Sequence, residues 1–102
     1  MGKDAALKII GEFRQSLIAG GLNPTRLILF GSQVTGTTHE DSDIDLILIS
    51  PDFAGQELWD RIQRIVPALM GVRTPMDVIP MTPEEWEEGG MIQDIAANGE
   101  DV

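Results

Sequence analysis

The segment from Asp43 to Ser50 is apolar up to its final serine except for two aspartates one residue apart, Asp43 and Asp45. Because side chains alternate along a strand, both aspartates project from one face, roughly 7 Å apart. Ile47 and Ile49 follow on that face, and apolar residues fill the other face. A strand that is apolar on both faces is covered on both sides. We therefore expect a central strand of a sheet, with its carboxylates at an end open to solvent.

The two aspartates also predict a bound cation. Like charges at this spacing repel each other and destabilise a strand unless a cation lies between them. Mg²⁺ fits such a pair, because it takes one or two carboxylates and completes its shell with water and substrate phosphates. Gly31 and Ser32 form a turn upstream, where small residues and free N–H groups let a phosphate approach. The stretch is typical of a site for a metal-bound nucleotide.

The first half of the chain predicts one helix and two strands. Apolar residues at helical spacing indicate a helix over residues 4–19, and Gly20-Gly21 ends the pattern. Residues 26–30 form a short buried strand. The second strand is the segment 43–50 described above.

The second half predicts a helix, a strand and another helix. An amphipathic helix runs from Gly55 to about Val66, and Pro67 would kink it or end its regular part. Residues 75–80 form a third strand. Thr82-Pro83-Glu84-Glu85 is a helix start, with an N-cap threonine, a proline at the first helical position and a capping-box glutamate.

The C-terminal part is less regular. Gly89-Gly90 keeps the preceding helix short, and its Trp86 packs the last helix or marks a partner surface. Residues 91–97 form one more helical segment, and residues 98–102 are a polar tail. The order α-β-β-α-β-α predicts an α/β (α+β) fold, a small mixed central sheet with helices packed on one face. A chain of 102 residues is one domain, residues 1–102.

Asp77 is a third acid, in a short hydrophobic strand where an unpaired carboxylate is costly. If the third strand lies beside the second, Asp77 adjoins Asp43 and Asp45. Three carboxylates on two adjacent strands can hold two divalent metals about 4 Å apart, which clamp the attacking and leaving oxygens of a phosphoryl displacement. A calcium loop over residues 41–52 is excluded, because Leu46 occupies the position that needs glycine. A phosphatase-like aspartyl nucleophile lacks supporting residues.

The Gly-Ser turn, the spacer and Ser-Asp-Ile-Asp-Leu at residues 42–46, followed by a later strand aspartate, resemble the minimal nucleotidyltransferases of the DNA polymerase beta-like superfamily. The resemblance implies that Asp43 and Asp45 are metal ligands. It implies that Asp77 binds the catalytic metal and helps to deprotonate the acceptor hydroxyl, and that the Gly31-Ser32 turn holds the β- and γ-phosphates. The family uses Mg²⁺ to move a nucleoside monophosphate from a triphosphate such as ATP onto a hydroxyl, and it releases pyrophosphate.

The sequence departs from this family after the first strand. Members commonly have Gly-Ser-Arg-x-Arg-Gly there, whereas Gln33 and Thr35 stand at the two arginine positions. Electrostatic stabilisation of the transferring phosphate is a large catalytic term, and one lost donor costs roughly 10²-fold or more. Arg73 or Arg26 would have to substitute, and nothing in the sequence places either at the site.

Composition limits the partners and the compartment. The formal net charge of -10, from 17 acidic and 7 basic residues, argues against sequence-independent binding of long nucleic acid. It is compatible with a nucleotide, because bound Mg²⁺ neutralises part of the repulsion. The lack of cysteine excludes disulfides, thiolate metal sites and a cysteine nucleophile. No apolar run near the N-terminus is long enough for a signal peptide or membrane span, so we expect a cytoplasmic protein without membrane contact.

Three functions fit these observations. The first is an Mg²⁺-dependent nucleotidyltransferase that uses ATP and whose acceptor arrives as, or within, another protein, because the chain holds no second domain to grip it. The resemblance implies a HEPN-domain partner, with this chain as the antitoxin half of a toxin–antitoxin pair. The second is an antitoxin that acts by occlusion with a weak or inactive nucleotide site, which the missing loop arginines and the acidic surface favour. The third is a small-molecule transferase of the antibiotic-modifying type, working as half of an oligomer.

Overall fold

The computed structural model describes residues 3–30, 44–72, 74–90, 94 and 99–102. The elements follow in the order α1 (Lys3–Ala19), β1 (Arg26–Phe30), β2 (Ile44–Ile49), the 3-10 helix η1 (Pro51–Phe53), α3 (Leu58–Met70), β3 (Met76–Met81), α4 (Pro83–Glu88) and β4 (Glu100–Asp101). The predicted helix–strand order is therefore confirmed from α1 to α4.

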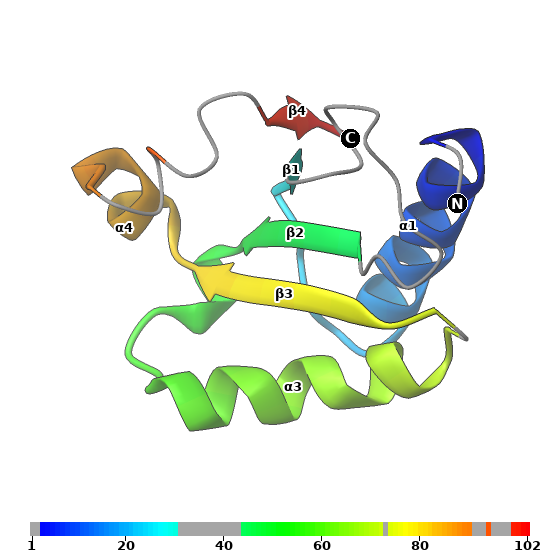
Figure 1. Cartoon of the computed structure of the whole chain (residues 1–102). Helices are drawn as coiled ribbons and strands as arrows, with labels where there is room; N and C mark the ends of the chain where they lie inside the picture. The colour runs from blue at the N-terminus through cyan, green and yellow to red at the C-terminus, as the bar shows by residue number, and fades with distance from the viewer. Residues whose placement is uncertain (1–2, 31–43, 73, 91–93, 95–98) are drawn as a thin grey trace.

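Four strands form one sheet in the order β3-β2-β1-β4 (Figure 1). β2 pairs in parallel with β3 and antiparallel with β1, and β1 pairs antiparallel with β4, so the sheet is mixed as predicted. β2 is an interior strand whose residues from Leu46 to Ile49 are all buried, which confirms the prediction of a central strand covered on both faces. α3 provides the crossover that the parallel pair requires.

The main hydrophobic core lies between one face of the sheet and the helices α1 and α3 (Figure 1). Every second residue of β1 and β2 points into it, and both helices add apolar residues at helical spacing. Its fully or almost fully buried members from these four elements are Ala6, Ile10, Phe13, Leu17, Leu27, Leu29, Ile44, Leu46, Leu48, Ile65 and Ala68. The prediction of helices packed on one face of the sheet is confirmed for this pair.

A smaller cluster lies on the opposite face of the sheet. Its buried members are Ile28, Ile47 and Ile49. Trp86 of α4 packs against them, so this tryptophan contributes to packing. Strand alternation places Asp45 and Asp77 on this second face, because each lies two residues from an isoleucine of the cluster or its rim.

α3 does not end near Val66 as the sequence predicted. It continues through Pro67 to Met70. Proline removes one backbone hydrogen bond and crowds the preceding turn, which usually kinks or breaks a helix. Here Ile65 and Ala68, on either side of it, are both buried in the core, and this packing holds the last turn in place.

The predicted polar tail at residues 98–102 contains a strand that the sequence did not predict, at Glu100 and Asp101. These residues form β4, which pairs with Ile28 and Leu29 of β1. A backbone hydrogen bond of 2.8 Å from the Val102 amide to Leu27 extends the pairing. The ladder uses backbone groups, so the polar side chains do not prevent it. The predicted helix over residues 91–97 lies outside the described residues except at Asp94, which is helical.

α4 begins as the sequence predicts. The Thr82 hydroxyl accepts a hydrogen bond from the Glu85 amide (3.1 Å), and the Glu85 carboxylate accepts one from the Thr82 amide (2.8 Å). This reciprocal pair is the capping box. Gly89 ends the helix with a φ of 74°, in the left-handed region that favours glycine.

Candidate functional site

Asp45 and Asp77 are direct neighbours across the parallel pair β2–β3. Neighbouring strands lie about 4.8 Å apart, and residues in register point to the same face, so the two carboxylates lie side by side. Asp45 is partly buried and Asp77 is exposed at the edge of the sheet. The structure thus brings together two of the three carboxylates that the sequence singled out.

The third predicted acid, Asp43, and the phosphate-binding candidates Gly31 and Ser32 lie outside the described residues. The last described residue before Gly31 is Phe30, which is the neighbour of Asp45 on β1. Among the described residues, no group of three histidine, cysteine or acidic side chains could hold a metal ion. The pair Asp45 and Asp77 supplies hard oxygen donors, which is the chemistry that Mg²⁺ prefers.

The four arginines within the described ranges bond to groups away from the acid pair. Their acceptors are the Val102 backbone oxygen for Arg14, Asp101 for Arg26, Glu85 for Arg61 and the Asp52 backbone oxygen for Arg64. Arg26, considered above as a substitute for the loop arginines, pairs with Ile49, four positions along β1 from Phe30. Arg26 therefore lies roughly 13 Å along β1 from Phe30, the residue that pairs with Asp45. Arg73 lies outside the described residues.

Arg26 belongs to a separate cluster. Its guanidinium makes two 3.0 Å hydrogen bonds to the Asp101 carboxylate and lies 5.7 Å from the ring centre of Trp86. The hydrogen bonds from Arg26 lower the pKa of Asp101, and the same bonds raise the pKa of Arg26. Pairing of β4 with β1 is therefore reinforced by an ion pair on the face that α4 covers.

Sequence reasoning missed Arg61, which joins α3, β3 and α4. Its side chain is only 12% exposed and makes bonds of 2.6 and 3.0 Å to Glu85, together with bonds to the backbone oxygens of Gln56 and Pro80. Arg61, followed by the Thr82 amide, lowers the pKa of Glu85 to about 2. A capping-box glutamate in the sequence signals the helix start, but nothing local signals its second partner on α3.

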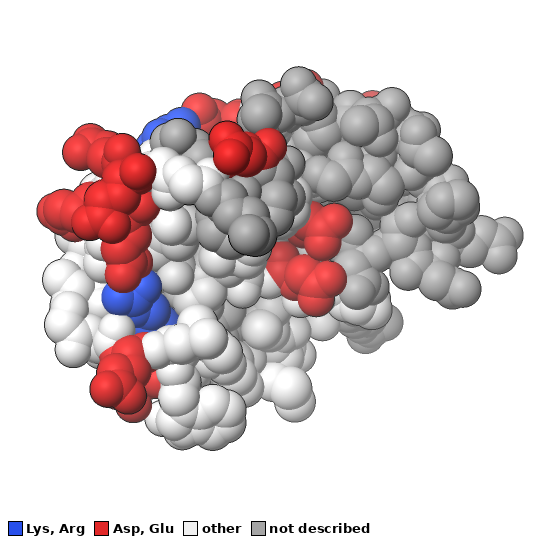
Figure 2. All heavy atoms as spheres, turned by 60° about the vertical axis from the view of Figure 1, so that its left-hand side comes forward, with Lys and Arg blue, Asp and Glu red and all other residues white. Residues whose placement is uncertain are grey.

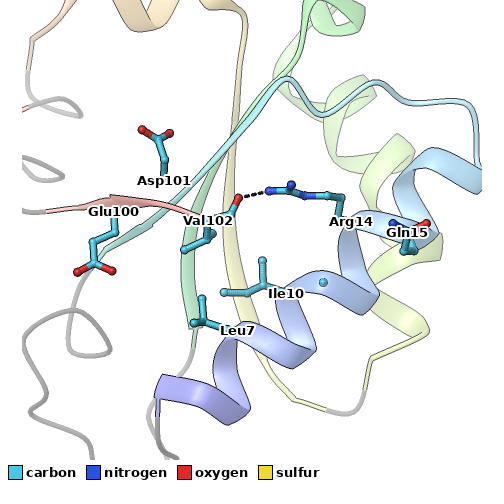
Figure 3. A pocket seen from close by; sticks show the side chains of 8 residues that line it. Leu7, Ile10, Arg14, Gln15, Glu100, Asp101 and Val102 are labelled. Carbon is cyan, nitrogen blue, oxygen red and sulfur yellow. Dashed lines mark hydrogen bonds between the residues drawn. The ribbon is translucent and has the colours of Figure 1, made fainter.

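Hollows lie near these elements, and the one that Arg26 and Trp86 line has a volume of about 530 Å³. Another of about 480 Å³ separates α1 from β4, where Arg14 reaches across to the Val102 backbone oxygen (Figure 3). A smaller one of about 180 Å³ lies between α3 and β3, and Asp77 lines it together with Ile62 and Leu69. Asp77 therefore borders a hollow that α3 lines from the other side, whereas Asp45 is not among its lining residues.

Among the charged side chains that Figure 2 shows, acidic ones predominate over basic ones in the view that brings the α4 side forward. α4, with the sequence Pro-Glu-Glu-Trp-Glu-Glu, contains four acidic residues. Across the ranges that the structure describes, no helix is long and apolar enough to cross a membrane.

Comparison with known proteins adds family and fold. The sequence profile of the nucleotidyltransferase domain matches residues 8–99. A crystal structure from Sulfolobus solfataricus, provisionally described as a nucleotidyltransferase, is similar with a TM-score of 0.74 and 18% identity, over 97% of this chain and 80% of that one. No curated protein sequence matches significantly.

Two plant structures are similar at a lower level. BolA1 from Arabidopsis thaliana has a TM-score of 0.56 and 17% identity, over 76% of this chain and 94% of that one. The BolA domain of SufE1 from the same plant has a TM-score of 0.51 and 19% identity, over 78% and 92%. At these identities the three structures show a shared fold and nothing of activity.

Proposed function

The chain belongs to the nucleotidyltransferase-domain family, and from this premise we propose that it transfers AMP from ATP, with Mg²⁺, to a hydroxyl group on a partner protein. The observation that carries the proposal is the placement of Asp45 beside Asp77 on the sheet face opposite to α1 and α3. Asp43, Gly31 and Ser32 complete the site in this proposal on the strength of the sequence motif.

In the proposed reaction the acceptor oxygen bonds to the α-phosphorus, the bond from that phosphorus to the bridging oxygen breaks, and pyrophosphate leaves. Asp77 takes the proton of the acceptor hydroxyl on a carboxylate oxygen, and its exposed position leaves room for an acceptor to approach. Asp43, Asp45 and Asp77 would hold the divalent metal ions. When bound, the metal supplies positive charge that offsets the phosphate charge as the bonds rearrange.

The acceptor is proposed to belong to a HEPN-domain toxin, with this chain as its antitoxin. The family resemblance and the acidic α4 side, which suits a basic partner, support this assignment. An antitoxin that acts by occlusion is the second candidate. It is favoured by Gln33 and Thr35 at the arginine positions, and by the bonds of Arg14, Arg26, Arg61 and Arg64 to groups away from the acid pair.

Incubation with ATP labelled at the α-phosphate, Mg²⁺ and a cell lysate tests the proposal. We expect label on a protein band with the native chain and none with the double variant Asp45→Asn/Asp77→Asn. The matched control is Asp4→Asn/Glu12→Gln, which removes two exposed carboxylates from α1 and should leave labelling unchanged. Label in a small molecule would replace the protein acceptor by an antibiotic-type one. No label, together with a stable complex between this chain and the toxin that survives both double substitutions, would establish occlusion instead.

A further inference from the structure

α3 exposes large apolar side chains that its core face does not use. The exposed residues, with their exposed fractions, are Leu58 (61%), Trp59 (66%), Val66 (41%) and Met70 (81%). The core face of the same helix buries Ile65 and Ala68. An aromatic side chain has about 150–250 Å² of surface, so Trp59 alone exposes on the order of 100 Å² or more.

These side chains are contiguous along the helix. Leu58, Ile62, Val66 and Met70 follow one another at four-residue intervals, and such a row forms one ridge on a helix surface. Trp59 lies beside this ridge. We call these five residues the α3 ridge. Large apolar side chains that are exposed side by side on a monomer are often an interaction site.

The neighbouring strand edge is unsuited to pairing with another strand. β3 is at the edge of the sheet. The Pro75 carbonyl accepts a hydrogen bond from the Ile44 amide (3.2 Å), and the Met81 carbonyl accepts one from the Ser50 amide (2.9 Å). The backbone N–H and C=O groups of the residues between them at every second position therefore point away from β2. One of these residues is Pro80, which has no N–H and whose backbone oxygen accepts a hydrogen bond from Arg61 (3.3 Å). A partner on this side must be held mainly by the side chains of α3.

We propose that the α3 ridge binds a second copy of this chain, with the two α3 helices antiparallel about a two-fold axis near residue 64. This register places Leu58 of one protomer against Met70 of its partner, and Ile62 against Val66. The four-residue row maps onto itself under the two-fold operation, as an isologous interface requires. Packing of two such ridges is the commonest helix–helix class in globular proteins.

Charge also favours a second copy as the occupant. The α3 ridge contains no charged side chain, and helical periodicity puts Asp60 and Arg64 on the other side of α3. Two chains of net charge -10 can therefore meet through a neutral surface. Their remaining charges repel at long range, so the dimer should become tighter as salt rises. A basic partner protein on the same ridge would show the opposite salt dependence.

The test is sedimentation velocity on the full chain from low micromolar to several hundred micromolar, at low and high salt. We expect a monomer–dimer equilibrium that Met70→Lys or Leu58→Glu weakens about tenfold or more, the scale of a central interface residue. Met70→Lys reduces the net negative charge, so weakening cannot come from added repulsion. Mixing Met70→Lys with Leu58→Glu should restore dimers, because the register brings these positions together. Ile18→Lys, at a 49% exposed position on α1, is the matched control and should dimerise normally.

A chain that stays monomeric at every concentration and salt level overturns the proposal, as does a dimer that both α3 variants leave unchanged. Failure of the mixture to dimerise overturns the antiparallel register. Circular dichroism shows whether each variant is folded, and the readout is independent of nucleotidyl transfer.

Discussion

Asp77 lies exposed on the edge strand β3, beside Asp45 of the interior strand β2. We expect Asp77→Asn to lower nucleotidyl transfer by about 10²-fold or more, the usual contribution of a general base. Its free energy of unfolding should change by no more than about 0.5 kcal/mol, because an exposed substitution loses little packing and removes repulsion from a neighbouring carboxylate. Transfer assays and chemical denaturation measure the two effects. Glu12→Gln, at an exposed position on α1, is the control, and full activity of Asp77→Asn would remove Asp77 from the mechanism.

Glu85 makes the stability of the protein depend on pH. Its pKa in the folded state is about 2, below its ordinary value of 4.5, chiefly because Arg61 donates hydrogen bonds to it. The stabilisation is therefore complete above about pH 4.5 and is lost as the pH falls toward 2. We expect this effect to contribute about 1 kcal/mol to the free energy of unfolding, because the Glu85 side chain is 40% exposed and water screens its ion pair with Arg61. Glu85→Gln should flatten the denaturation free energy across this window, whereas Glu84→Gln should not.

At the level of elements, Pro67 is a weakness within α3. It occupies an exposed position inside the helix, where it removes a backbone hydrogen bond. Pro67→Ala should raise the free energy of unfolding by about 2 kcal/mol, since proline costs about 3 kcal/mol in a helix interior and restricts the unfolded chain by less than that. Urea denaturation at a fixed protein concentration measures the change. Gln63→Ala, one turn earlier and also exposed, should give a change several times smaller; equal or lower stability of Pro67→Ala would contradict the argument.

Elements with local signals were predictable from the sequence. The capping box at Thr82 and Glu85 starts α4 as expected, because its hydrogen bonds join residues three apart. The two apolar faces of β2 identified an interior strand. β4 was missed, because Glu100 and Asp101 are polar and their pairing with β1 joins distant parts of the chain. For the site, side-chain alternation along the strand predicts the face from which Asp45 projects. That Asp45 lies beside Asp77 depends on the pairing of β2 with β3, and the sequence predicted this neighbourhood only if the two strands were adjacent.

On the scale of the whole molecule, the sheet separates two surfaces. α1 and α3 cover one face, and the α3 ridge is exposed on this side. Asp45 and Asp77 project from the other face. A dimer through α3 would therefore lie on the opposite side of the sheet from Asp45, and it would approach Asp77 at the hollow that Ile62 and Asp77 both line.

Because the net charge is -10, both salt screening and specific metal binding should raise the melting temperature, and the two effects can be distinguished. Self-repulsion of a charged chain opposes compactness, so NaCl should raise the melting temperature of the native chain and of its variants alike. At equal ionic strength, MgCl₂ should add a further rise for the native chain only. A metal at ten times its dissociation constant stabilises by about 1.4 kcal/mol, which is about 6–11 °C for a domain of this size. The double variant Asp45→Asn/Asp77→Asn should keep the NaCl effect and lose the extra rise, while Glu84→Gln/Glu88→Gln keeps both. Chelation of Mg²⁺ should cancel the extra rise. If the Asp45→Asn/Asp77→Asn chain retained it, Mg²⁺ would be binding to the acidic surface elsewhere.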